Sequence, residues 1–201
     1  MTGTASKAPQ RADARKNIEK ITQAAIDCLG RDPAASLGQI AQTAGVGRVT
    51  LYGHFPSREV LVEAALIRAL ADGEEVLAAV DLAGDPRQAL RGLIESSWQL
   101  TAQASSILEA AQATLPAGRI HDLHTKPEQR VNALIRRGQT EGVFRTDLPA
   151  DWLASMMHHV MKGAAADVLD GRLDQNDAAH YITEVVLGAY APPTQQGSPH
   201  A

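Results

Sequence analysis

The stretch SLGQIAQTAGVGRVTLYGHFPSRE (residues 36–59) predicts two short helices joined by a tight turn. Ser36 is a good N-cap and Gln39, three residues later, completes a capping box, so the first helix is expected to begin directly after Ser36. Gly45 ends this helix, because the residue after a helix commonly adopts a positive φ, which glycine accepts at little steric cost. The second helix is expected to open at Gly47.

Two short helices in this order are typical of a helix-turn-helix, whose second helix enters the major groove of DNA. We expect the buried side of that second helix to carry Val49 and Leu51. The polar side chains that remain are candidates for DNA contact. The hydroxyl of Thr50 and the phenol of Tyr52 suit phosphate oxygens, and Arg48 suits either a guanine edge or a phosphate.

The same window resembles the DNA-binding domain of TetR-family transcriptional regulators. The residues that carry the resemblance are Ile40, Ala41, Ala44, Gly45, Val46, Thr50, Leu51, Tyr52, His54, Phe55, Ser57, Arg58, Glu59 and Leu61. The resemblance implies that Thr50, Tyr52 and His54 contact backbone phosphates. In this family the next helix often begins with a phosphate-binding lysine; Arg58 stands there in this chain, which keeps the charge and adds a planar fork. The alternative for Tyr52 is that it is a core aromatic, like Phe55. The predicted DNA contacts are Gly47, Arg48, Thr50, Tyr52, His54 and Arg58.

Charge is distributed unevenly along the 201 residues, whose formal net charge is −4. Residues 1–60 carry eight Lys or Arg against five Asp or Glu, giving +3, whereas residues 61–201 carry eleven against eighteen, giving −7. Only the N-terminal part is therefore suited to a polyanion. A basic arm that reaches phosphate or the minor groove would consist of Lys7, Arg11, Arg15 and Lys16, the alternative being a solvated tail.

Apolar residues recur at helical spacing in the rest of the chain, and no stretch alternates with period two. We expect an all-α protein of nine or ten helices. An N-terminal three-helix helix-turn-helix domain is predicted over residues 1–58, a helical effector-binding and dimerisation domain over 59–191, and a disordered tail over 192–201. The first helix is predicted over 13–29, and a further helix is expected to begin at residues 126–127.

The last two predicted helices carry apolar stripes with spacings of three and four residues. The resemblance implies that they pair with the same helices of a second chain in a four-helix dimer contact, the alternative being packing within one chain. The predicted dimer contacts are Leu153, Val160, Ala164, Val168, Ala178, Ile182, Val185 and Ala189. A homodimer places two recognition helices, the second helix of each helix-turn-helix, about 34 Å apart on one side of the duplex, which predicts a palindromic operator.

The resemblance also implies a small-molecule effector site among the central helices, whose occupation lowers DNA affinity by a population shift. Methionine and tryptophan adapt to apolar ligands, and histidine can orient a polar group. The predicted wall residues are Trp98, Met156, Met157, His158 and Met161. The small number of aromatic residues, seven in the whole chain, favours an aliphatic or mixed ligand over a flat cationic one.

One short motif suggests a different function. His121 and His124 are spaced so that they suit two metal ligands on one helical face, with Asp122 beside them, and the alternative hypothesis is an α-helical metal-dependent enzyme. No third or fourth ligand stands at a recognisable spacing, and the motif is also typical of a surface loop. Since no nucleophile elbow, phosphate-binding loop or dinucleotide motif occurs, we expect no catalysis, no metal and no cofactor.

The chain has a single cysteine, Cys28, which allows no internal disulfide and suits a reducing cytosol. No segment approaches the roughly eighteen uninterrupted apolar residues of a membrane span, and the N-terminus lacks the apolar core of a signal peptide. We therefore expect a cytoplasmic homodimeric repressor that binds a double-stranded DNA operator and is released from it by an effector.

Overall fold

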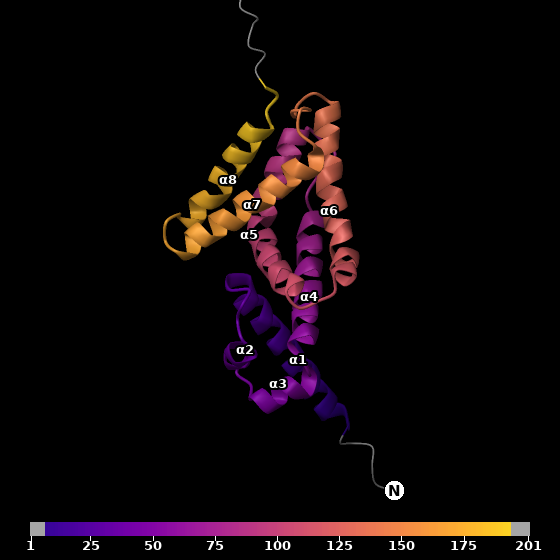
Figure 1. The fold of residues 1–201 in the computed structure, drawn as a ribbon, viewed down its shortest axis with the longest axis vertical. Helices are drawn as coiled ribbons and strands as arrows, with labels where there is room; N and C mark the ends of the chain where they lie inside the picture. Colours follow the sequence, from indigo (N-terminus) through magenta and orange to yellow (C-terminus); the bar gives the residue numbers. More distant parts are fainter. Residues whose placement is uncertain (1–6, 194–201) are drawn as a thin grey trace, which may run out of the picture. The chain divides into compact units, whose positions relative to one another are not determined.

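The computed structural model describes residues 7–193, except for the side chains of residues 7–11, 121 and 124–128. The described residues contain helices and no strand, which confirms the predicted all-α class (Figure 1). The helices found there are α1 (Lys7–Arg31), α2 (Leu37–Ala44), α3 (Arg48–His54), α4 (Arg58–Ala78), α5 (Pro86–Gln112), α6 (Ala117–Thr140), α7 (Ala150–Leu169) and α8 (Gln175–Tyr190). A segment both long and apolar enough to span a bilayer is not found among them. Most of the predicted tail, residues 194–201, lies outside the described residues.

The described part of the chain has eight helices rather than nine or ten, and α6 begins earlier than predicted. A loop was expected around residues 115–125 and a new helix after it, but α6 begins at Ala117 and runs through Pro127. A proline inside a helix removes one backbone hydrogen bond. Burial of Val131 and Ile135 on the following turns holds this helix in place despite that loss.

The connection between α2 and α3 has the predicted geometry. Ser36 Oγ accepts a hydrogen bond from Gln39 N at 3.3 Å, and Gln39 Oε1 accepts one from Ser36 N at 2.7 Å. Gly45 has a φ of 68° and ends α2, and Gly47 is the N-cap of α3. The predicted helix-turn-helix is therefore confirmed down to its caps.

The described residues up to Asp72, together with Ala102–His124, form one compact unit. Within it α1 lies against α2, and α2 against α3 (Figure 1). Its largest fully buried side chains are Ile21, Leu29, Ile40, Leu51, Leu61, Leu66 and Ile107. Leu51, only 1% exposed, anchors α3 from its inner side.

Gly73–Thr101 and the described residues from Thr125 onward form a second unit with its own core. Here α7 lies against α8 (Figure 1). The phenol of Tyr190, at the end of α8, donates a hydrogen bond to the carbonyl of Leu153 on α7 at 2.6 Å. The Tyr190 ring also meets Phe144 edge to face, with ring centroids 5.4 Å apart. The α7–α8 pair is thus tied by both apolar packing and a buried polar contact.

The division between the two units falls within α4, α5 and α6, whereas the prediction separated two domains after residue 58. Side-chain packing explains the difference. Leu61 and Ala65, in the first half of α4, are buried in the same core as the helix-turn-helix. The part of the chain that supports α3 therefore extends well beyond the three N-terminal helices.

Candidate nucleic-acid interface

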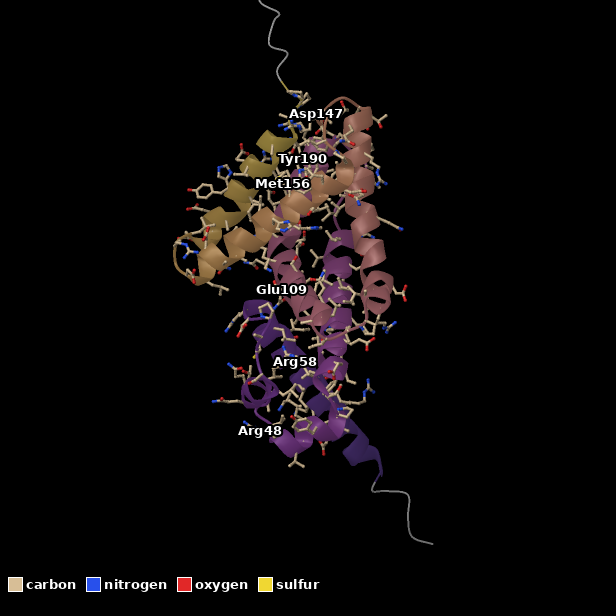
Figure 2. The ribbon with its side chains drawn as sticks, in the orientation of Figure 1. Arg48, Arg58, Glu109, Asp147, Met156 and Tyr190 are labelled. Atoms are coloured by element: carbon tan, nitrogen blue, oxygen red, sulfur yellow. The ribbon has the colours of Figure 1, made fainter. Side chains whose placement is uncertain are left out.

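Helix α3 presents several of the predicted DNA contacts to solvent. Figure 2 shows Arg48 on α3, and this side chain is exposed. Tyr52 is 51% exposed, so the interpretation of Tyr52 as a core aromatic is wrong, whereas Phe55 is buried. Thr50 and His54 are half-buried. Gly47, the N-cap, leaves open space around the first turn.

One exposed residue of α3 was missed by the sequence reasoning. Val49 was expected on the buried side together with Leu51, but it is 88% exposed, so that expectation is wrong. Residues two apart lie about 200° apart around a helix axis, so these two side chains cannot share a face. An exposed valine beside Arg48 offers a methyl surface of the kind that contacts the methyl group of thymine.

A hollow of about 550 Å³ opens beside α3. Its polar lining consists of Ser36, Arg48, Tyr52 and Arg58, and none of its lining residues is acidic. The N-terminus of α2 borders the same hollow, and the positive end of a helix dipole favours an anion. The exposed guanidinium of Arg48 and a helix N-terminus without a facing carboxylate form an environment that suits a phosphate.

Arg58, which was predicted to contact DNA, forms hydrogen bonds within its own chain. Figure 2 shows it at the beginning of α4, and its guanidinium donates hydrogen bonds to the carbonyl of Pro33, at 2.8 Å, and to that of Ala35. Both acceptors lie in the connection between α1 and α2. No local pattern in the sequence indicates this contact, because the partners are 23 and 25 residues away.

Glu59 places a negative charge next to Arg58 at the beginning of α4. A hydrogen bond from the Ser57 hydroxyl, helped by the backbone of Glu59 itself, holds the pKa of this carboxyl below its usual value. The carboxylate is therefore ionised at neutral pH, in the first turn of a helix, where an acidic group is favourable.

The predicted basic arm is helical where the structure describes it. Helix α1 begins at Lys7 rather than at residue 13, so Arg15 and Lys16 are exposed residues of a helix. The side chains of Lys7 and Arg11 lie outside the described residues.

The predicted effector residues lie in or around one core. Trp98, Met157 and Met161 are buried in the core of the second unit, and Met156 on α7 packs against it (Figure 2). His158, also on α7, is half-buried. The structure thus gathers the predicted wall residues around α7.

Several predicted dimer contacts point into their own subunit. Leu153, Ala178 and Ile182 are fully buried in the core of the second unit, so they cannot meet a second chain. The half-buried residues that pack against this core are Val160, Ala164, Val168 and Ala189. Only Val185 among the predicted contacts is well exposed, at 55%. The apolar stripes were recognised correctly but, apart from Val185, they lie on the inner faces of α7 and α8.

The motif with the two histidines lies on α6 and not in a surface loop. Asp122 is exposed there, while the side chains of His121 and His124 lie outside the described residues. Among the side chains that the structure does describe, no three His, Cys, Asp or Glu residues gather in a way that could hold a metal ion.

Comparison with known sequences supports the interpretation of the N-terminal region. The family "Bacterial regulatory proteins, tetR family" matches residues 21–65, which include α2, α3 and the beginning of α4. The HTH-type transcriptional regulator NfxB from Pseudomonas aeruginosa is 24% identical over 181 residues, and the match covers 88% of this chain and 96% of NfxB.

Solved structures of the same type share the fold. The TetR-like transcriptional regulator LfrR from Mycobacterium smegmatis, crystallised in complex with proflavine, gives a TM-score of 0.68 at 20% identity and covers 87% of this chain and 96% of LfrR. A TetR family transcription regulator from Marinobacter aquaeolei VT8 gives 0.66 at 18% identity and covers 91% and 98%. The resemblance inferred from the helix-turn-helix is thereby confirmed.

Proposed function

The chain belongs to the TetR family of bacterial transcription regulators, and we propose that it is a cytoplasmic homodimeric repressor, released from a palindromic DNA operator by a small-molecule effector. The observation that carries the DNA-binding part is the surface of α3. Arg48 and Tyr52 are exposed there, beside a hollow without acidic lining residues. The buried Leu51 anchors the helix from its inner side. We propose Gly47, Arg48, Thr50, Tyr52 and His54 as DNA contacts, and add Val49.

The dimer part of the proposal rests on the outer faces of α7 and α8. Trp152 and Tyr181 are 62% and 51% exposed, and aromatic side chains are enriched in protein interfaces. Small exposed residues stand between the larger ones and permit close approach of a second pair of helices. The proposed contact residues are Trp152, Gly163, Ala166, Tyr181, Val185 and Gly188. This face replaces the buried stripe as the candidate dimer contact.

The effector part of the proposal rests on the core around α7. Trp98 and the methionines of α7 supply adaptable apolar surface, and His158 supplies a polar group on the same helix. The crystal structure of LfrR, which has the same fold, contains proflavine. An effector that enters this core binds one arrangement of the helices better than the other, which is the condition for shifting the DNA-competent population.

The DNA-binding part is tested by selecting genomic fragments that the purified protein retains, followed by titration at several salt concentrations. We expect the selected fragments to share an inverted repeat. Arg48→Ala should weaken binding about tenfold or more and lower the slope of log K against log salt by about one, because one phosphate contact is lost. Arg136→Ala, which removes the same charge from an exposed position on α6, is the control and should bind like the wild type. A wild-type protein that prefers no fragment over random DNA contradicts the proposal.

Metal analysis separates the regulator from the alternative metal-dependent enzyme. A regulator should purify with no stoichiometric metal, and His124→Ala should leave its DNA binding unchanged. Stoichiometric metal that disappears in His124→Ala would favour the enzyme.

A further inference from the structure

Arg58 connects two parts of the chain that flank the helix-turn-helix. It is the first residue of α4, and its two terminal nitrogens donate to the carbonyls of Pro33 and Ala35. Hydrogen bonds from a charged donor contribute more than those between neutral groups, and a planar fork can serve two acceptors at once. The guanidinium is therefore held in a defined position before any DNA is present.

Two backbone carbonyls in the connection between α1 and α2 receive their hydrogen bonds from Arg58. Its N–H groups are satisfied locally, since Asp32 accepts from Ala34 N at 2.9 Å and from Ala35 N at 3.0 Å. The carbonyls of Pro33 and Ala35, by contrast, accept their hydrogen bonds from the distant Arg58 side chain. Ala35 is only 4% exposed, and a buried carbonyl that loses its donor destabilises the folded state.

The contact joins the two ends of the segment that contains α3, the proposed recognition helix. Helices α2 and α3 lie between residue 35 and residue 58 in the chain, so Arg58 joins the beginning of α2 to the beginning of α4. We infer that Arg58 is a positioning residue: it holds α3 in the orientation that presents Arg48 and Tyr52, and it is not itself a phosphate ligand. This inference rests on the proposed DNA-binding function.

Arg58→Lys separates the two roles. Lysine keeps the positive charge, but it has a compact ammonium in place of the planar fork. A phosphate contact at residue 58 survives this substitution, because a point charge serves a phosphate well. A contact that spans two backbone carbonyls does not.

The experiment compares wild type, Arg58→Lys and Arg48→Ala, first as free proteins and then on a selected DNA fragment, far below the unfolding temperature. For Arg58→Lys we expect faster hydrogen exchange of the backbone amides of residues 34–40 and an unfolding midpoint lower by about 3 to 8 °C. DNA affinity should fall about tenfold, with no change in the salt slope. Arg48→Ala, the control, should lower the salt slope by about one and leave exchange at residues 34–36, next to the carbonyls that Arg58 binds, unchanged.

Other outcomes overturn the inference. Wild-type exchange, midpoint and affinity in Arg58→Lys, combined with a salt slope lower by about one in Arg58→Ala, would make Arg58 a phosphate ligand. Faster exchange with unchanged affinity would leave Arg58 a purely structural residue and would equally reject the positioning role. If the wild type binds no fragment, the proposed function fails, while unchanged exchange at residues 34–40 in Arg58→Lys would independently reject the contact as a restraint.

Discussion

The Nη2 atom of Arg48 lies 2.9 Å from the position that a Cβ atom on Gly38 would occupy. Gly38 stands in the first turn of α2, so the absence of a side chain there leaves the space that the guanidinium uses. The Arg48 guanidinium thus lies near the N-terminus of α2, at the edge of the hollow that Arg48 and Arg58 both line. A positive group and a positive helix end at one place favour the binding of an anion between them.

Gly38→Ala should separate stability from DNA binding. The added methyl group displaces only the far end of a flexible, exposed side chain, while alanine favours the helix, so the free energy of unfolding should rise by about 0.5 to 1 kcal/mol. DNA affinity should fall severalfold, because Arg48 loses its orientation. In the Arg48→Ala background, Gly38→Ala should leave affinity unchanged. An equal loss of affinity in both backgrounds would show that Gly38 acts through something other than Arg48.

Val49 should read a thymine methyl group. Val49→Ala should weaken binding to a selected fragment roughly threefold to tenfold, because an apolar contact in the major groove is lost. The measurement compares fragments in which single thymines are replaced by uracil, which removes only the methyl group. One such replacement should weaken the wild type and leave Val49→Ala unaffected. If no thymine position behaves in this way, Val49 does not read a methyl group.

Val185→Asp should weaken the dimer. The substitution places a carboxylate on the exposed face of α8, where burial against a second chain would leave the charge unpaired. The molar mass in solution, measured by light scattering over a range of concentrations, should shift from dimer toward monomer. Ile67→Asp, at a comparably exposed position on α4, is the control and should remain dimeric. A dimer that is unaffected by Val185→Asp would exclude this face.

Tyr190→Phe should lower the free energy of unfolding at neutral pH. It should also make that free energy depend less on pH at high pH. Loss of the hydrogen bond to Leu153 should cost about 1 kcal/mol. Burial raises the pKa of the Tyr190 phenol above its ordinary value near 10, so the folded state holds this proton more tightly than the unfolded state does. The stability that depends on it is complete below about pH 10 and is lost as the pH rises further.

Urea unfolding at neutral pH and between about pH 10 and 11.5 measures both effects. The free energy of unfolding should fall more steeply with pH in the wild type than in Tyr190→Phe. Tyr181→Phe, at an exposed tyrosine of the same helix, should keep the wild-type slope. Equal slopes in the wild type and Tyr190→Phe would contradict the buried phenol as their source.

The sequence by itself determined the features that depend on neighbouring residues. The capping box of Ser36 and Gln39, the left-handed Gly45 and the positions of α2 and α3 follow from interactions within a few residues, so residue type and spacing were enough to predict them. The all-α class and the family resemblance have the same origin. Helical geometry would also have predicted the exposure of Val49. The prediction was wrong because it assigned Val49 and Leu51 to the same face of the helix.

Only the tertiary structure decided which partners meet across the chain. Arg58 and its acceptors are more than twenty residues apart, and nothing in the local sequence distinguishes a free arginine from one bound to the α1–α2 connection. Leu153 and Ile182 lie on stripes of the kind that an interface requires, yet packing within the subunit buries them. Periodicity indicates that a face is apolar, but what covers that face depends on segments distant in the chain, whose arrangement spacing alone does not encode.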